Sequence, residues 1–362
     1  MDKLKVDYIL GKRSAEVNGI YRYAWEIIKN GQEAVDGSFI DYNPKMQLPV
    51  INKSPALLVY PLVVTRRIRK DSIKHLCSHI QAHLLNYLKL EPSVVTCFDI
   101  YPFLQDQYPF MDRNMVKLGL RGMLKADRII TISEYSGEEI AQALGYPREK
   151  IRVTHLGVDH RRFRPLPRDA SLRERYAVPA GKRIILYVGS EQPRKNVLTL
   201  IEAFATVKRD CANVVLLKVG RPQWKTARQE LEELIRRLGL RDDVIFIDYL
   251  PEEELPALYN SADLFAFPSV YEGFGLPPLE AMACGCPVVS SNTSSLPEVV
   301  GEAGIMVDPH DTDGLASAMC EVLSSDDLGE ELIRKGLEQA RKFNWEKTAN
   351  ETIMVYKEIM HG

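Results

Sequence analysis

Apolar and polar positions follow two different periods along most of this 362-residue chain. Short runs of β-branched and other apolar residues alternate with segments in which apolar residues recur every three or four positions. The first pattern predicts buried strands and the second predicts amphipathic helices. Strands that alternate with helices are typical of parallel sheets covered by helices. The pattern is clearest after residue 180, where we expect strands at 183–189, 213–220, 243–247, 264–268, 288–290 and 305–307 and helices at 196–208, 222–240, 252–261, 277–283 and 311–323.

The first half of the chain is less regular. Two prolines alternate with charged residues at 161–168, which is more typical of a linker than of a core. We therefore predict an α/β protein with two Rossmann-like doubly wound domains, at 1–164 and 165–343, followed by a helix in 344–362. The first domain is expected to contain strands at 6–10, 56–64, 94–98 and 128–132 and helices at 19–29 and 136–144.

Composition and charge narrow the class of protein. The hydrophobic share is 45%, the charged share is 27% and the net charge is −2, as in a soluble globular protein with no electrostatic reason to bind nucleic acid. The six cysteines form no Cys-x-x-Cys pair, which favours a reducing compartment. There is neither a membrane-spanning apolar run nor a signal-peptide pattern, so we expect a cytoplasmic protein.

The segment 269–290 carries the most informative chemistry. Glu272 and Glu280 flank a Gly-Phe-Gly turn and a double proline. Proline is favoured in the first turn of a helix, so Glu272 is expected on a loop and Glu280 about one turn into the helix. Free backbone N–H groups at a helix start bind anions, and carboxylates bind hydroxyl groups. This pattern predicts a site for an anion that also carries hydroxyls.

A second segment places cations at the end of a strand. Arg194 and Lys195 follow the strand that ends at Gly189, and Gly220 ends the next strand. A guanidinium and an ammonium beside free N–H groups suit a diphosphate. Ligands of doubly wound sheets bind beyond the carboxyl ends of the strands, where both groups are expected.

These segments resemble the retaining glycosyltransferases of family 4. That family has the GT-B fold, with two Rossmann-like domains that face each other across a cleft, and a Glu, seven residues, Glu pattern that corresponds to Glu272 and Glu280. The flanks at 262–268 and 285–289 match as well. The resemblance implies an enzyme that moves a hexosyl group from a nucleotide-diphosphate sugar, of the GDP-mannose or UDP-glucose type, to a hydroxyl of a glycan, lipid-linked or small-molecule acceptor, with retention of configuration. It also implies an N-terminal acceptor domain, a C-terminal nucleotide-sugar domain and a final helix that crosses back to the first domain.

The resemblance assigns roles residue by residue. Arg194 and Lys195 would hold the diphosphate, Glu272 the donor-sugar hydroxyls and Glu280 the ribose hydroxyls. Cations and helix dipole would then balance the charge of the leaving group, so neither a metal nor another cofactor is expected. We expect Glu272, Arg194, Lys195 and Asp99 to be catalytic, and the donor-binding residues to be Gly19, Gly189, Arg194, Lys195, Gly220, Tyr249, Leu250, Glu272, Gly273, Phe274, Gly275, Leu276 and Glu280.

One position departs from the family. Many members carry His-Asp at a strand end where this chain has Phe98 and Asp99. Phenylalanine makes no hydrogen bond to a sugar hydroxyl, so Asp99 or a backbone carbonyl is left to orient the acceptor. A GT-B nucleotide-sugar epimerase and a catalytically silent nucleotide-sugar-binding subunit therefore stay open as alternatives.

Two further features have competing interpretations. His75, His79 and His83 are spaced by four, which on one helix would form a face able to bind zinc, but the local pattern also fits a strand followed by a helix. The basic cluster 66–70 and the amphipathic basic stretch 115–125 fit a solvated face, and also peripheral contact with anionic lipid at the inner membrane face. The oligomeric state has no sequence signal.

Overall fold

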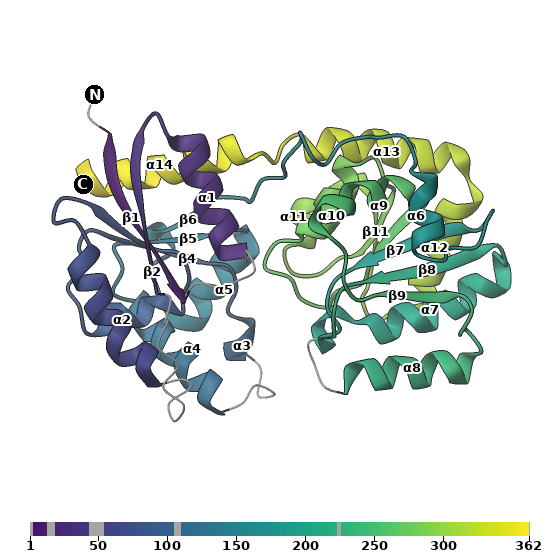
Figure 1. Cartoon of the computed structure of the whole chain (residues 1–362), viewed down its shortest axis with the longest axis horizontal. Helices are drawn as coiled ribbons and strands as arrows, with labels where there is room; N and C mark the ends of the chain where they lie inside the picture. The colour runs from purple at the N-terminus through teal and green to yellow at the C-terminus, as the bar shows by residue number, and fades with distance from the viewer. Residues whose placement is uncertain (1–2, 13–18, 43–53, 105–109, 223–225, 362) are drawn as a thin grey trace. The chain divides into compact units, whose positions relative to one another are not determined.

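The computed structural model describes residues 3–12, 19–42, 54–104, 110–222 and 226–361. Contacts divide the chain into two compact units: unit 1 is Met1–Gly157 together with Trp345–Gly362, and unit 2 is Val158–Asn344 (Figure 1). Each unit is built around its own parallel six-stranded sheet. In the described residues, no helix is both long and apolar enough to span a lipid bilayer.

The sheet of unit 1 has the strand order β2-β1-β3-β4-β5-β6. The chain runs outward from β1 to β2 and then returns to β3 on the other side of β1, so the order reverses between β1 and β3. The strands are β1 Leu4–Lys12, β2 Val35–Tyr42, β3 Ile73–Leu76, β4 Ser93–Cys97, β5 Arg128–Thr131 and β6 Ile151–Val153. The helices are α1 Gly19–Gly31, α2 Ser54–Arg67, η1 Gln81–Asn86, α3 Tyr101–Leu104, α4 Phe110–Met123, α5 Glu134–Leu144, η2 Arg148–Lys150 and the C-terminal α14 Trp345–His361.

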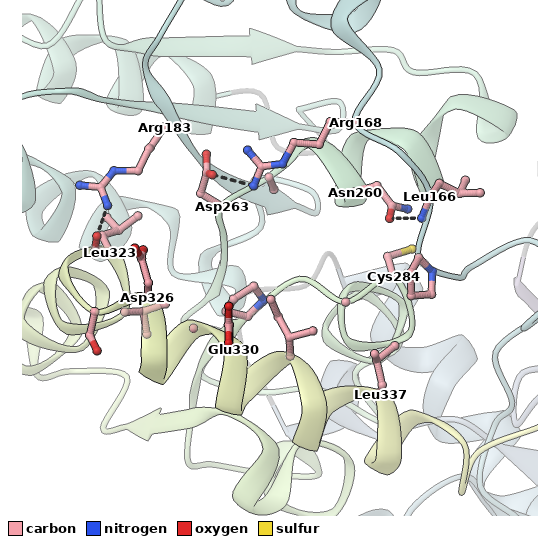
Figure 2. A pocket seen from close by; sticks show the side chains of 18 residues that line it. Leu166, Arg168, Arg183, Asn260, Asp263, Cys284, Leu323, Asp326, Glu330 and Leu337 are labelled. Carbon is pink, nitrogen blue, oxygen red and sulfur yellow. Dashed lines mark hydrogen bonds and ion pairs between the residues drawn. The ribbon is translucent and has the colours of Figure 1, made fainter.

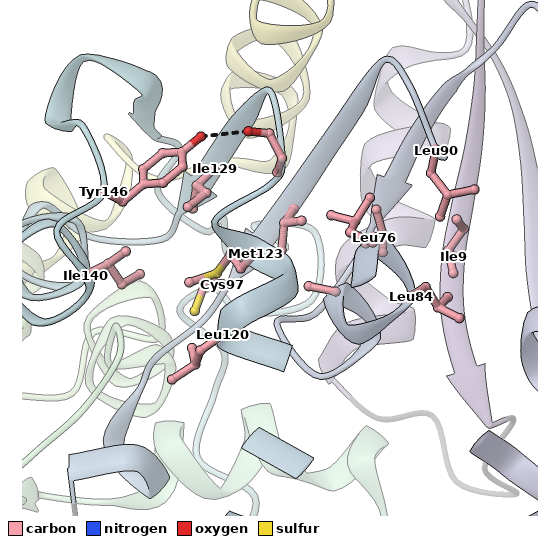
Figure 3. Packing of buried hydrophobic residues seen from close by; sticks show 14 of the residues in the cluster. Ile9, Leu76, Leu84, Leu90, Cys97, Leu120, Met123, Ile129, Ile140 and Tyr146 are labelled. Atoms are coloured by element: carbon pink, nitrogen blue, oxygen red, sulfur yellow. Dashed lines mark hydrogen bonds between the residues drawn. The ribbon is translucent and has the colours of Figure 1, made fainter. Parts of the chain in front are cut away.

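Apolar side chains from one sheet face, α2, η1, α4 and α5 form a continuous core in unit 1 (Figure 3). Ile9, Leu76 and Cys97 point into this core from three strands, and Leu84 and Leu120 come from η1 and α4. The helices α1 and α14 contact each other elsewhere in unit 1. The core cluster therefore fixes η1 and α4 against the sheet.

The expected strand at 56–64 is wrong, because this segment lies in helix α2. Tyr60 and Val64 are buried four residues apart, and Leu62 between them is exposed, which is the spacing of a helix. Short apolar runs rich in β-branched residues do not distinguish a buried helix from a strand by periodicity alone.

Unit 2 repeats the architecture with the order β12-β11-β10-β7-β8-β9. Here the order reverses between the neighbouring strands β7 and β10. The strands are β7 Arg183–Val188, β8 Val214–Val219, β9 Val244–Ile247, β10 Leu264–Phe267, β11 Val288–Ser291 and β12 Ile305–Val307. The helices are α6 Ala170–Arg175, η3 Pro193–Lys195, α7 Val197–Asp210, α8 Ala227–Leu238, η4 Glu252–Glu254, α9 Leu255–Ser261, α10 Leu276–Ala283, α11 Leu296–Val299, η5 Gly301–Ala303, α12 Thr312–Ser324 and α13 Asp326–Ala340.

The proline-containing segment 161–168 is attached to unit 2. Phe163 is fully buried, with its ring centroid 6.2 Å from that of Tyr259. The amide of Leu166 donates to Oδ1 of Asn260 at 2.6 Å. The change from one unit to the other therefore falls between Gly157 and Val158, before these prolines, because burial of Phe163 fixes the segment to α9.

Candidate active site

The candidate site lies at the carboxyl ends of β7 and β10 in unit 2. Since the strand order reverses between these two neighbours, the connections after them leave toward opposite sides of the sheet and open a crevice. The turn η3 follows β7 and carries Arg194 and Lys195, and the loop that carries Glu272 follows β10. The topology thus brings together two motifs that are far apart in the sequence.

The two cations and the carboxylate bind one another directly. Nζ of Lys195 lies 2.5 Å from Oε1 of Glu272, and an Arg194 guanidinium nitrogen lies 3.2 Å from Oε2. The same Arg194 nitrogen donates to the carbonyl of Tyr271 at 2.9 Å. The Lys195 ammonium also lies 5.4 Å from the ring centroid of Phe267. Two positive charges against one negative charge leave this cluster with an excess of positive charge.

Glu272 is held in its ionised form. Burial of this side chain, which is 6% exposed, raises the pKa of its carboxyl, but the charges of Lys195 and Arg194 lower it by more, and the net shift of the pKa is downward. A carboxylate at this position accepts hydrogen bonds and does not donate them.

Hydroxyl groups of the β11–α11 connection hold the loop around Glu272. The amide of Glu272 donates to Oγ of Ser294 at 3.0 Å. Oγ of Ser295 lies 2.9 Å from the carbonyl oxygen of Glu272 and 2.8 Å from that of Phe274. These serines were missed in the sequence, because serines after a strand have no distinctive pattern until their partners are known.

Helix α10 begins at Leu276 and supplies free amides. Gly275 precedes it with φ 114°, a conformation that favours glycine. The N–H groups of Gly275 and Leu276 have no hydrogen-bond partner among the residues that the structure describes. Together with the first-turn dipole they provide an anion-binding helix start beside the cationic cluster.

Glu280 lies one turn into α10, as the sequence predicts. Its side chain is only 6% exposed, and the hydroxyl of Tyr259 donates to its Oε2 at 3.2 Å. This hydrogen bond from α9 orients the carboxylate from outside its own helix. Gly273 and Phe274 lie in the turn between the two glutamates, where the ring centroid of buried Phe274 is 5.7 Å from that of Phe343.

Glycines allow close backbone contact at the ends of β7 and β8. Gly220 has φ 121°, and a Cβ on it would overlap the carbonyl oxygen of Gly189. Beyond β9, Tyr249 is 66% exposed and precedes Leu250, and the guanidinium carbon of Arg221 lies 5.1 Å from the Tyr249 ring centroid. These predicted donor-binding positions therefore lie along the same sheet edge as the cationic cluster.

A buried charge cluster behind this edge was not predicted. Nζ of fully buried Lys218 lies 2.6 Å from Oε1 of buried Glu191. Arg228 binds the same Glu191 oxygen and Oδ1 of Asp248, both at 2.5 Å. Asp248 immediately precedes Tyr249, so this cluster ties the loop after β9 to the ends of β7 and β8. The sequence signal that was available is a lysine at an apolar position of a buried strand.

The remaining predicted site residues lie in unit 1. Gly19 opens α1, and residues 13–18 before it are outside the described residues. Oδ1 of Asp99 accepts the amide of Tyr101 at 3.2 Å, just beyond β4. Phe98 packs edge-on against Tyr23, with centroids 5.5 Å apart.

The three histidines do not share one helical face. His75 is in β3 and has both ring nitrogens paired, Nδ1 with Tyr356 at 2.6 Å and Nε2 with Thr96 at 2.7 Å. His79 follows that strand, and His83 is in η1. The strand-then-helix interpretation is therefore correct.

Unit 2 also has a cavity of about 550 Å³ at the amino ends of its strands, at the opposite edge of the sheet from Arg194 and Glu272 (Figure 2). Arg168 and Asp263 form an ion pair of 2.8 Å in its wall, and Glu330 of α13 lines it. None of the predicted site residues lines this cavity. Its volume alone is therefore no reason to place the chemistry there.

The fold and the charged crevice define a glycosyltransferase with the GT-B fold, and comparison with known proteins agrees. Residues 169–339 match the family described as "Glycosyl transferases group 1", and residues 31–162 match "Glycosyltransferase Family 4". The chain belongs to the family 4 glycosyltransferases and is an enzyme of glycan biosynthesis of this class. The predicted family and fold are confirmed.

Individual relatives agree with this assignment. The chain is 34% identical to the O-antigen chain mannosyltransferase B of Escherichia coli, over 94% of this chain and 96% of that protein. It is 31% identical to the serotype-specific mannosyltransferase WbdA of Escherichia coli, over 75% of this chain but only 34% of that longer protein. The crystal structure of Anabaena Alr3699/HepE in complex with UDP and glucose has the same fold, with a TM-score of 0.82, 19% identity and coverage of 98% of this chain and 100% of that chain.

Proposed function

We propose that this protein is a retaining mannosyltransferase, which moves a mannosyl group from a nucleotide-diphosphate sugar of the GDP-mannose type to a hydroxyl of a glycan acceptor. The observation that carries the proposal is the Lys195–Glu272–Arg194 cluster beside the free amides of Gly275 and Leu276. The relative that matches along 96% of its own length, the O-antigen chain mannosyltransferase B of Escherichia coli, supports mannose as the transferred sugar.

The donor is bound through two kinds of group: its anionic diphosphate and its hydroxyls. The guanidinium of Arg194, the ammonium of Lys195 and the start of α10 face the diphosphate, and they stabilise the charge that grows on it as the glycosidic bond breaks. This charge balance comes from the chain itself, so the reaction is proposed to proceed without a divalent metal. Glu280, oriented by Tyr259, accepts hydrogen bonds from the ribose hydroxyls.

Glu272 accepts hydrogen bonds from hydroxyls of the donor sugar. Because its carboxylate is already ionised and fixed by two cations, and its backbone amide is bound to Ser294, Glu272 positions the sugar without reorganising. The acceptor hydroxyl attacks from the face on which the diphosphate leaves. The departing phosphate oxygen takes the acceptor proton, and attack from the leaving-group face preserves the anomeric configuration.

We also propose a cytoplasmic location, from the state of the cysteines. All six cysteines are free thiols, which is typical of proteins in a reducing compartment.

The test is incubation of the protein with GDP-mannose, UDP-glucose and other nucleotide sugars, with a neutral mannoside as acceptor and with or without EDTA. We expect an α-linked product from an α-linked donor, identified by the one-bond carbon–proton coupling at the anomeric carbon in NMR, at a rate that EDTA does not change. Inversion at the anomeric carbon would contradict the retaining mechanism. Epimerised donor without transfer would support the epimerase alternative, and nucleotide binding without turnover would support the silent subunit.

A further inference from the structure

Unit 1 has its own strand-order reversal, between β1 and β3, and a short polar segment lies there. Cys77 still pairs with β1, its amide donating to the carbonyl of Ile9 at 3.1 Å, and the chain then leaves the sheet. Residues 77–83 therefore lie beyond the carboxyl end of β3 at the reversal, which is where doubly wound sheets bind ligands.

This segment concentrates buried polar atoms that have no partner. Within the described part of the chain, eight buried side-chain atoms lack a hydrogen bond, and three of them are Nε2 of His79, Oε1 of Gln81 and Nε2 of His83. The two histidines are 8% and 6% exposed. Unsatisfied buried polar groups are rare in folded proteins because each one costs stability. Three such groups within five positions call for a common explanation.

Glycines on the neighbouring elements allow close packing around this segment. A Cβ on Gly119 would overlap the carbonyl oxygen of His79, and a Cβ on Gly122 would overlap that of Ala82. On the other side, a Cβ on Gly11 at the end of β1 would overlap the side-chain amide of Gln81. Helix α4 therefore packs closely against the backbone of residues 79–82 on one side, and the end of β1 lies against the side chain of Gln81 on the other.

The chemistry of the three groups selects an uncharged ligand. Burial lowers the pKa of both histidines, and neither the charge of Asp99 beside His79 nor the Ile80 carbonyl that His83 contacts at 2.7 Å reverses this. Two neutral imidazoles and an amide oxygen offer single hydrogen-bond donors and acceptors. Hydroxyl groups, which both donate and accept, match them, and a phosphate does not.

We propose that His79, Gln81 and His83 bind hydroxyl groups of the acceptor, and that the acceptor residue they bind is a neutral sugar. The proposal rests on the proposed glycosyl transfer and adds to it the residues that recognise the acceptor, none of which the resemblance assigned. These three side chains also give unit 1 hydrogen-bonding groups for the acceptor, whereas Phe98, at the position where many family members have a histidine, gives none.

The central test is the Gln81→Met variant, because it removes an unpaired oxygen and keeps the length of the side chain. Initial rates of transfer are measured against the concentration of α-mannobiose, with mannose 6-phosphate as the charged comparison. We expect the KM for α-mannobiose to rise about tenfold, while the KM for the donor and the rate of donor hydrolysis without acceptor stay within about threefold. The His79→Leu variant should behave in the same way, and Gln142→Met, which is exposed on α5 of the same unit, should match the wild type.

Stability separates a binding role from a structural one. Since Oε1 of Gln81 has no partner, its removal should leave the melting temperature unchanged or raise it. A lower melting temperature with an unchanged KM for α-mannobiose would overturn the proposal, as would a wild type that transfers only to mannose 6-phosphate.

A wild type that neither transfers nor hydrolyses any donor would refute the proposed function and not this site. The site is then tested by saturation-transfer NMR with α-mannobiose, where the wild type should show a signal that Gln81→Met loses. Equal signals, or none in the wild type, would overturn the assignment of this segment.

Discussion

The hydroxyl of Tyr356 lies 2.6 Å from Nδ1 of His75, joining α14 to β3 across 281 positions of the sequence. The other ring nitrogen of His75 lies 2.7 Å from Oγ1 of Thr96, and all three side chains are fully buried. With a partner on each nitrogen, the neutral imidazole donates through one and accepts through the other. The C-terminal helix is therefore fixed to the core of unit 1 by directional hydrogen bonds as well as by apolar contact.

Tyr356→Phe should destabilise the protein by about 1–3 kcal/mol, because it leaves a buried imidazole nitrogen without its partner. Urea denaturation of the variant and the wild type measures the difference. Tyr249→Phe makes the same chemical change at a 66% exposed ring and should shift the midpoint little. Equal midpoints for Tyr356→Phe and the wild type would show that the hydrogen bond contributes nothing.

His75 should also make stability depend on pH. Burial lowers its pKa to about 3 in the folded protein, whereas an unfolded histidine has a pKa of about 6.5. Between these values the unfolded chain binds a proton that the folded chain does not, so the free energy of unfolding falls as the pH falls through this range. The contribution is complete above about pH 6.5 and decreases by up to about 1.4 kcal/mol per pH unit below it.

The comparison that isolates His75 is the slope of stability against pH between 6.5 and 4.5 in wild type and His75→Gln. The slope for the variant should be shallower, because its unfolding no longer includes the uptake of about one proton by residue 75. His310→Gln, at an exposed position, should run parallel to the wild type. A parallel line for His75→Gln would mean that the buried ring is protonated as easily as in the unfolded chain.

The fold of unit 2 could be predicted from its sequence because its strands are short apolar runs, and three of them, β7, β8 and β10, are followed directly by a glycine or a proline. Unit 1 was harder. Its β2 strand, Val35–Tyr42, mixes apolar and polar residues, and α2 has the composition of a strand. In both cases burial against the sheet decides the structure, and a single sequence does not show which residues share a core.

The residues of the candidate sites also fall into two groups, those that the sequence predicts and those that only the structure shows. Arg194, Lys195, Glu272 and Glu280 could be found because their chemistry is local in sequence: a pair of cations after a strand, and two carboxylates around a helix start. Ser294 and Ser295, and the unpaired atoms of His79, Gln81 and His83, could not be found. Their significance depends on distances and on missing partners, and both are properties of the folded chain.

Glu272 and Arg194 should affect nucleotide binding in opposite directions. In the free protein Glu272 neutralises part of the charge of both cations, so Glu272→Gln should leave the affinity for GDP unchanged or raise it. Arg194→Ala should weaken the binding of GDP by about 2 kcal/mol, or about 30-fold, because it removes the charge-assisted bond that we propose Arg194 makes to the diphosphate. Isothermal titration calorimetry with GDP measures both, and Glu321→Gln, at an exposed position of α12, is the matched control.

The same variants separate binding from turnover. Glu272→Gln should reduce the rate of transfer by about a hundredfold or more while GDP still binds, since we propose that its carboxylate contacts the sugar and not the nucleotide. Transfer at the wild-type rate would exclude Glu272 from the reaction. Weaker GDP binding in Glu272→Gln than in Arg194→Ala would contradict the arrangement of charges in the crevice.

Gly220→Ala tests the close approach of the two strand ends at the site. Gly220 has φ 121°, and an added Cβ would overlap the carbonyl oxygen of Gly189, so both backbone strain and a clash oppose the substitution. Gly145 has φ 61° with open space around the position of a Cβ, so Gly145→Ala meets only the cost of a left-handed conformation, about 1 kcal/mol. Denaturation should show a clearly larger loss for Gly220→Ala than for Gly145→Ala, and only Gly220→Ala should lose affinity for GDP. If the two variants lost equal stability and kept equal affinity, the contact between Gly220 and Gly189 would be irrelevant to the site, because the clash is what distinguishes the two glycines.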